Sequence, residues 1–311
     1  MAKFVVRQTP LFYLLIVLAC VSCSSGSDNA QLINIIGSEG SGDGQFKYVE
    51  DFAFDYNGHV LITDALNSNV QVFRLDGRYV TSFGGKGQGN ENLKKPEGIA
   101  IDSKGNIHVA DYLSGYIKKY SSEYQHLLTY SGYGEKEGLT LETEFMTYHP
   151  NGHLYVPEAG NNRISVFNME GEFKFSFAKT GSDQGELIRP EAAKHNSRGH
   201  LVVADLGNHR IQIFDEKGNF LKTWGKEGSA PGEFRKPTGV AIDKEDNIFV
   251  ADIGNSRIQK FNALGEFQYM FGSSGRKAGE FGNLHGIAIG PTGKLYVADT
   301  ANHRVQVFSV K

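Results

Sequence analysis

Four glutamates, a threonine and a histidine occupy one position of a 47-residue repeat. In chain order they are Glu50, Glu97, Glu144, Glu191, Thr238 and His285. If this position opens the innermost strand of each repeat, the side chains converge. Crowded carboxylates repel, so some must hold a proton at raised pKa or share a cation. Oxygen ligands suit calcium or magnesium, whereas a single histidine serves zinc poorly. The sequence predicts a divalent-cation site or a basic-ligand site here, with a solvated glutamate rim as the alternative.

A second group of candidates lies where one repeat departs from the others. Tyr116 stands where four repeats carry arginine, and Tyr112 stands where the others carry small or aliphatic residues. Tyr133 follows in the next loop. Exposed tyrosines supply a large contact area at low entropic cost. We predict that Tyr112, Tyr116 and Tyr133 form a ligand-binding patch, although the tyrosines could equally fill a groove between repeats.

Lys194 is the remaining candidate ligand-binding residue. It replaces an alanine or threonine on the predicted innermost strand. A lysine there should extend its amine into the central channel, toward Glu191 or Glu144.

The repeat that positions these residues has no insertion or deletion. An acidic residue recurs every 47 residues, at Asp64, Asp111, Glu158, Asp205, Asp252 and Asp299. Arginine recurs at Arg163, Arg210, Arg257 and Arg304, with an asparagine two residues before each. Because one ligand seldom needs so many copies of one contact, we predict that this acid caps a turn and that the arginine pairs with a carboxylate or a turn carbonyl.

Each repeat has the pattern of four strands. In the fifth, residues 239–242 and 248–251 are continuously apolar, whereas residues 257–261 and 266–271 alternate, as expected for inner and outer strands. Four-stranded units of this period form β-propellers. Residues 30–311 span six periods, and the last period ends before its fourth strand. Residues 32–36 have that strand's pattern. The prediction is an all-β, six-bladed propeller closed by the N-terminal strand pairing with the last blade.

The repeat also resembles the NHL repeat, on residues 237–243, 250–252, 255–261 and 302–308. The resemblance implies a six-bladed propeller, but NHL propellers serve RNA binding, protein binding, sensing and lyase chemistry. The related amidating lyases hold zinc with histidines at such strand-opening positions, of which only His285 matches here. Gluconolactonase-like propellers hold one calcium with Glu, Asn and Asp, a set that the glutamates could imitate loosely.

The first 29 residues have the pattern of an export signal. Lys3 and Arg7 precede an apolar run, residues 11–19, that is too short to span a bilayer comfortably. Residues 17–20 resemble a bacterial lipobox, which implies lipidation at Cys20, with Cys23 as the alternative. We predict a lipoprotein-type signal peptide over 1–22, a flexible tether over 23–29 and the propeller over 30–311. An ordinary cleaved signal, giving a secreted protein, is the other interpretation.

Composition limits the possible functions. The two cysteines lie at 20 and 23, so residues 30–311 contain no thiolate ligand, disulfide or cysteine nucleophile. The net charge of −3 becomes about −5 without Lys3 and Arg7, which argues against a nucleic-acid partner. The spacing of the serine, histidine and aspartate residues does not indicate a Ser-His-Asp catalytic triad.

Three functions follow from these limits. The first is a monomeric, non-catalytic scaffold that binds a protein, peptide or glycan in the cell envelope and contacts the membrane through a lipid anchor only. The second is a metal-dependent lyase or lactonase that uses the glutamate ring. The third is a structural module of a larger envelope complex.

Overall fold

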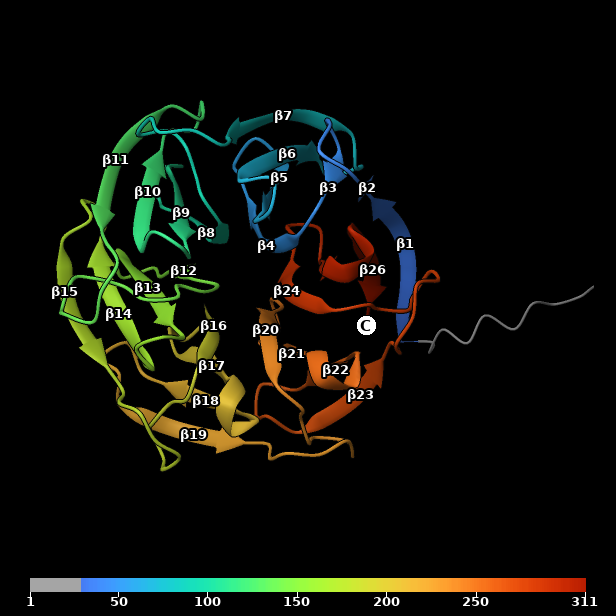
Figure 1. Cartoon of the computed structure of the whole chain (residues 1–311). Helices are drawn as coiled ribbons and strands as arrows, with labels where there is room; N and C mark the ends of the chain where they lie inside the picture. Colours follow the sequence, from blue (N-terminus) through green and yellow to red (C-terminus); the bar gives the residue numbers. More distant parts are fainter. Residues whose placement is uncertain (1–28) are drawn as a thin grey trace, which may run out of the picture.

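The computed structural model describes residues 29–311, which form six four-stranded antiparallel sheets arranged around a ring (Figure 1). Each sheet is one blade, with its first strand at the centre of the ring and its fourth at the periphery. The predicted all-β six-bladed propeller is therefore confirmed. The proposed signal peptide, both cysteines and most of the tether lie outside the described residues.

The strands repeat in the same order in every blade. Blade one contains β4 (Val49–Phe54), β5 (His59–Asp64), β6 (Asn69–Arg74) and β7 (Tyr79–Gly84). Blade two contains β8 (Pro96–Ile101), β9 (Ile107–Asp111), β10 (Tyr116–Tyr120) and β11 (His126–Ser131). Blade three contains β12 (Thr147–Tyr148), β13 (His153–Glu158), β14 (Arg163–Asn168) and β15 (Phe173–Phe177).

The second half of the ring follows the same plan. Blade four contains β16 (Pro190–His195), β17 (Leu201–Asp205), β18 (Arg210–Phe214) and β19 (Phe220–Trp224). Blade five contains β20 (Pro237–Ile242), β21 (Ile248–Asp252), β22 (Arg257–Phe261) and β23 (Phe267–Phe271). Blade six contains β24 (Leu284–Ile289), β25 (Lys294–Asp299), β26 (Arg304–Val310) and β1 (Ala30–Ile36).

Short elements complete the ring. The parallel pair β2 (Ser38–Glu39) and β3 (Gln45–Phe46) lies in the loop before blade one, and three 3-10 turns follow second strands, at Leu206–Asn208, Ile253–Asn255 and Thr300–Asn302. No helix in residues 29–311 has the length and apolar character needed to cross a membrane.

The core lies between neighbouring blades. In blade five every residue of β21 is buried, whereas β23 alternates between half-buried and exposed positions. Central strands contact both adjacent sheets, so both of their faces must be apolar. One core cluster joins Phe145 of blade three to Phe234 and Phe261 of blade five through residues of blade four. The apolar residues that recur in each repeat thus pack between successive blades and form the core around the ring.

The N-terminal strand closes the ring as predicted. β1 pairs antiparallel with β26, with Ala30 opposite Val310 and Ile36 opposite Val305. The Lys311 amide also donates to the Asn29 carbonyl at 3.0 Å. In Figure 1 the blue β1 lies along the red sheet of blade six. The sheet edge that would otherwise be open is paired, which removes a site for aggregation.

The ring has two different faces. The loop-rich face carries the start of each first strand, the end of each second strand, the start of each third strand and the loops between blades. The turn face carries the two tight turns within each blade. Pairing of Pro237 with Asp252, and of Asp252 with Arg257, places all three on the loop-rich face.

The innermost strands approach each other closely. A Cβ atom on Gly239 would lie 2.5 Å from the His285 carbonyl oxygen, so only glycine fits there. Blade three has Phe145 at this position, and its first strand is shortened to β12. Instead, the Phe145 amide donates to the Glu191 carbonyl of blade four at 2.9 Å.

The recurring acid and arginine are structural, as predicted. In blade five the Arg257 Nε donates to the Asp252 carboxylate at 2.8 Å, while its other nitrogens donate to the carbonyls of Ser229 and Glu233 at 2.6 and 2.8 Å. Asn255 donates to the same carboxylate at 2.8 Å. The cluster therefore ties the inter-blade loop to the blade that follows it.

Removing Arg257 should destabilise the ring. Arg257→Ala leaves the fully buried Asp252 carboxylate without its cation, so we expect the free energy of unfolding to fall by about 3 kcal/mol, measured by urea denaturation. Arg78→Ala, which breaks the exposed pair with Asp76, is the control and should cost little. Equal effects of the two substitutions would contradict a structural role for the cluster.

Candidate functional site

The predicted glutamate ring exists on the loop-rich face, but it is buried. Glu50, Glu97 and Glu144 are only 2–4% exposed. Glu50 and Glu97 are the second residues of β4 and β8, and Glu144 lies three residues before β12. His285 and Glu50 form a hydrogen bond, with 2.7 Å between the His285 Nδ1 and the Glu50 Oε2. Lys95 lies 2.5 Å from the Glu97 carboxylate. A solvated rim is therefore excluded for these three glutamates.

Protons stabilise this cluster, which we call the channel-mouth cluster (Glu50, Glu97, Glu144, Glu191 and His285). Burial and the charge of Glu50 raise the pKa of Glu97 to about 8. Burial and the other glutamates hold the pKa of Glu144 well above its ordinary value, and burial also raises the pKa of Glu191. Burial opposes protonation of His285, but Glu50 outweighs it and raises the histidine pKa. At neutral pH the cluster holds shared protons.

A collar of larger side chains covers the channel-mouth cluster. Lys95 and Arg189 bring positive charge to Glu97 and Glu191, and the Arg189 guanidinium also donates to Glu142 at 2.9 Å. Tyr48 lies edge-on to His285, with ring centroids 5.6 Å apart. Burial, reinforced by the four glutamates, raises the pKa of Tyr48 to about 12. The collar residues stand two positions before the glutamates, and sequence reasoning did not identify them.

The cluster does not match a metal centre. Residues 29–311 contain no group of three or more His, Cys, Asp or Glu side chains placed to hold a metal ion. The negative charge is instead balanced by protons, Lys95, Arg189 and His285. A calcium or magnesium site at Glu50, Glu97, Glu144, Glu191 and His285 stays a prediction that would require these side chains to rearrange.

Lys194 enters the channel but does not pair with Glu191 or Glu144. Its Nζ lies 3.8 Å from the Asp51 carboxylate and donates to the Met146 carbonyl at 3.2 Å. Lys194 is three residues beyond Glu191, about 10 Å along the strand, so it meets a residue below the channel-mouth cluster. Lys194 is therefore an internal channel residue and does not join the tyrosines.

Asp51 is the channel residue that sequence reasoning missed. It is fully buried, burial raises its pKa, and its Oδ1 has no hydrogen-bond partner among the described residues. The sequence does distinguish this residue, because the other five repeats carry glycine, alanine or phenylalanine at the same position.

Tyr112 has different surroundings from the other two tyrosines of the predicted patch. Tyr112 is half-buried beside the collar, where the Lys95 amine lies 3.9 Å from its ring centroid. Tyr116 and Tyr133 are 42% and 65% exposed. The separation follows from the strand ends, because Tyr112 directly follows β9 whereas Tyr116 opens β10.

Tyr116 lines an opening that we call the blade-two pocket. Its volume is about 320 Å³. Its walls are residues 87–90, Asn92 and Lys94 of the preceding loop, together with Asp111, Ser114, Tyr116, Lys118 and Thr129 of the blade. Lys118 donates to the loop carbonyls of Asn90 and Asn92 at 2.8 and 2.5 Å. The pocket lies on the loop-rich face, in the repeat that departs most from its siblings.

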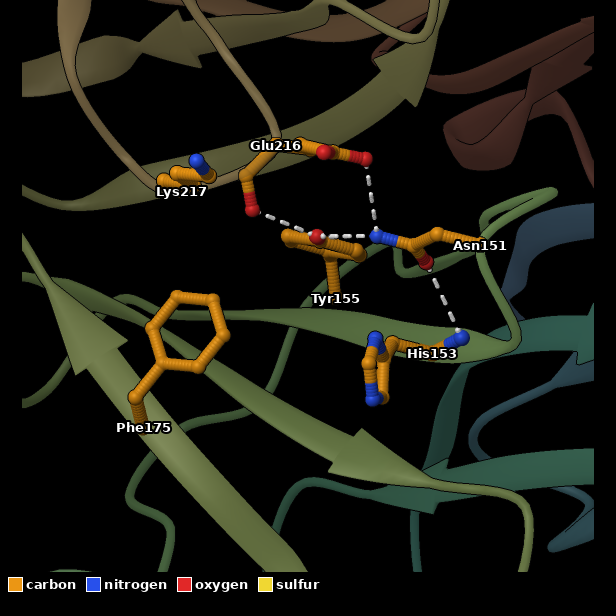
Figure 2. A pocket seen from close by; sticks show the side chains of 6 residues that line it. All are labelled: Asn151, His153, Tyr155, Phe175, Glu216 and Lys217. Carbon is orange, nitrogen blue, oxygen red and sulfur yellow. Dashed lines mark hydrogen bonds between the residues drawn. The ribbon is translucent and has the colours of Figure 1, made fainter.

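A second pocket, of about 410 Å³, lies on the turn face between blades three and four. Figure 2 shows that its polar groups bond one another: Asn151 donates to the Tyr155 hydroxyl at 2.9 Å, and that hydroxyl donates to the Glu216 carbonyl at 2.7 Å. Phe175 forms an apolar wall. Sequence reasoning missed this pocket, since its residues show no shared chemical pattern.

Comparison with family models supports the repeat assignment. The model of the NHL repeat matches residues 281–308, and a model described as a 6-bladed beta-propeller matches residues 55–131 and 193–270. No curated protein matches this chain in sequence.

Solved structures resemble the chain in fold. A Bacteroides thetaiotaomicron protein of unknown function is 15% identical, with a TM-score of 0.69 over 91% of this chain and 76% of the other. An auxiliary nutrient binding protein from the same organism is 14% identical, with a TM-score of 0.64 over 86% and 70%. Virginiamycin B lyase from Staphylococcus aureus is 15% identical, with a TM-score of 0.62 over 91% and 99%. At such identities the likeness shows the fold alone.

The channel-mouth cluster should make stability depend on pH. The folded-state pKa of Glu97, about 8, exceeds its ordinary value of 4.5, so the stability that its proton contributes is complete below pH 4.5 and lost as the pH rises to about 8. The free energy of unfolding should fall by up to about 1.4 kcal/mol per pH unit for each such proton. Glu97→Gln should reduce this slope and raise the Tm at pH 8.

The exposed Glu137→Gln is the matched control and should leave the slope unchanged. Thermal unfolding from pH 5 to 9 measures both variants. A slope that is the same in Glu97→Gln as in the wild type would contradict proton sharing at the channel mouth.

Proposed function

This chain belongs to the NHL-repeat six-bladed β-propellers, and from that premise we propose that it is a non-catalytic binding protein of the cell envelope. In this proposal its loop-rich face binds a protein, peptide or glycan. Because the fold serves many functions, the proposal depends on features that distinguish this chain from a regular repeat.

The blade-two pocket is the observation that carries the proposal. It is open, lies on the loop-rich face, and is bordered by the exposed Tyr116. Tyr133, which is also exposed, belongs to the next loop on the same face. A polar recess beside rigid aromatic side chains is a common arrangement for anchoring a ligand. The channel-mouth cluster, in contrast, is covered by its collar.

The fold neighbours are consistent with a binding role. An auxiliary nutrient binding protein and a lyase share the architecture, so neighbours alone do not choose between binding and catalysis. The absence of a metal-type cluster in residues 29–311 favours binding over a metal-dependent reaction.

Attachment to the envelope is a further part of the proposal. Lipidation at Cys20, or at Cys23 as the alternative, would hold a monomeric ring at a membrane, with no direct insertion of the propeller. The mass of the mature N-terminal peptide tests this, since a lipid-modified cysteine and an unmodified cleaved terminus differ by the acyl chains.

Truncating Tyr116 should weaken binding. Residues 30–311, which contain every strand of the closed ring, are used to select binders from peptide libraries and glycan arrays. Tyr116→Ala should reduce affinity for the selected binders by at least about tenfold, as expected for an aromatic anchor. Tyr56→Ala, which alters a 75% exposed tyrosine on the turn face, should not. Binding that survives Tyr112→Ala, Tyr116→Ala and Tyr133→Ala alike would overturn the proposed site.

The second candidate function is a metal-dependent lyase or lactonase at the channel-mouth cluster. A virginiamycin B lyase shares the fold, but residues 29–311 contain no metal-binding group, and we derive no metal-dependent step.

A cation titration separates the two candidates. We expect that calcium, magnesium and zinc leave the Tm of the metal-stripped ring unchanged. A cation that raises the Tm of the wild type, but not of Glu97→Gln and Glu191→Gln, would establish a channel-mouth site by linkage. Assays on lactones and esters would then replace the binding proposal with the enzymatic one.

A further inference from the structure

Four blades insert a guanidinium group at the same place on the loop-rich face. In blade four, Arg210 Nε donates to the Asp205 carboxylate at 2.8 Å. Its terminal nitrogens donate to the carbonyls of Ser182, Asp183 and Glu186, each at 2.8 Å. The guanidinium thus occupies a niche made of one buried carboxylate and three loop carbonyls. This arrangement recurs with Arg163 and Arg257, and Arg304 keeps the carboxylate and two of the carbonyls.

Blade two keeps the acceptors of this niche but has no arginine. Asp111 accepts hydrogen bonds from the Lys94 and Lys95 amides and from Ser114, and the Asn92 carbonyl accepts one from Lys118. Asp111 is fully buried and corresponds to Asp205, while the carbonyls of Gln88, Gly89 and Asn92 correspond to those of Ser182, Asp183 and Glu186. Tyr116 replaces the arginine and is 42% exposed, so its ring stands outside the niche. The blade-two pocket is the space in which the sibling blades hold their guanidinium groups.

The loop over the pocket is also less closed than its siblings. In the loop before blade four, Thr180 and Leu187 form a bridge that draws the two ends of the loop together. Within residues 29–311, five of the six inter-blade loops form a bridge at this position, and the loop of residues 84–93 does not. Blade one also lacks the arginine, but its loop is closed by β2 and β3.

The charges near the pocket differ from the siblings in two positions. Lys118 replaces the glutamine of four other repeats, and Glu91 replaces the glycine that the other five repeats carry. Lys118 is held by the carbonyls of Asn90 and Asn92. It neutralises Asp111 in part, while Glu91 adds negative charge at the exposed rim, beside the exposed Lys94. The carboxylate of Asp111 has no ion-pair partner within salt-bridge distance among the described residues, unlike the equivalent acids of blades three to six.

We propose that the blade-two pocket binds the guanidinium group of an arginine-containing ligand. Asp111 and the Gln88 and Gly89 carbonyls would accept its hydrogen bonds, and the Tyr116 ring would stack on its plane. The inference rests on the proposed binding function and specifies the chemistry of the ligand. The guanidinium could belong to a peptide or to a small molecule, and these two sources are separated by the test.

The test compares arginine and lysine probes. Acetyl-Gly-Arg-Gly-amide, its lysine counterpart and agmatine are titrated calorimetrically into residues 30–311. The arginine peptide should bind at least about tenfold more tightly than the lysine peptide. The planar guanidinium group can donate several hydrogen bonds to the acceptors of the niche at once, whereas the lysine ammonium lacks this geometry. Agmatine binding as tightly as the peptide would identify a small-molecule source, and weaker agmatine binding a peptide source.

Two variants make the prediction specific to the niche. Tyr116→Arg restores the sibling residue, so it should abolish binding of the arginine peptide and raise the Tm by about 2–4 °C. Lys118→Gln restores the sibling glutamine and removes a like charge, so it should tighten binding several-fold. Tyr56→Arg, which adds the same side chain on the turn face, should change neither. Equal binding of both peptides, or undiminished binding to Tyr116→Arg, would overturn the inference.

The two proposals can fail separately. If no arginine probe binds but Tyr116→Ala still weakens binders selected from the libraries, the guanidinium inference is wrong and the binding proposal stands. If Tyr116→Ala and Tyr116→Arg both leave selected binders unaffected, both are wrong at this site.

Discussion

The loop-rich face depends on one buried carboxylate in each blade. Asp252 accepts a hydrogen bond from the Arg235 amide of the incoming loop at 2.7 Å and from Asn255 and Arg257 of its own blade. A buried carboxylate without such partners would be costly, so loop and blade must form together. In blades that keep the asparagine and arginine partners, the inter-blade loop is fixed to the blade. In blade two these partners are replaced, and a pocket lies between the loop and the blade.

The same face carries two polar systems with opposite character. At the channel mouth, burial raises the pKa of Glu97, Glu144 and Glu191, and Lys95, Arg189 and His285 bring positive charge to the cluster. In the blade-two pocket, no arginine occupies the place beside the buried Asp111 and the carbonyls of Gln88 and Gly89. A ligand that takes this place displaces no guanidinium group of the chain, and we therefore propose this pocket, rather than the channel mouth, as the binding site.

The fold could be predicted almost entirely from the sequence, because an unbroken period of 47 residues determines blade number, strand order and ring closure. The candidate site could be predicted only in part. Convergence of Glu50, Glu97, Glu144 and Glu191 follows from their shared position. Their burial depends on Lys95 and Arg189, whose repeat position carries a basic residue in only three of the six repeats. Asp51 could have been found by asking which inner-strand position departs from small residues. Tyr112 and Tyr116 belong to the same repeat, which is why the sequence predicts one patch. Tyr112 follows β9 and lies beside Lys95, whereas Tyr116 opens β10 and lines the blade-two pocket.

Ring closure also determines how the propeller is oriented. Ala30 pairs with Val310, the end of β26 opposite to Arg304, and Arg304 lies in the loop-rich cluster. Asn29 therefore joins the ring at the turn face. Any attachment made through the residues before Asn29 would hold the propeller by its turn face. The blade-two pocket, which lies on the loop-rich face, would then be directed away from the point of attachment.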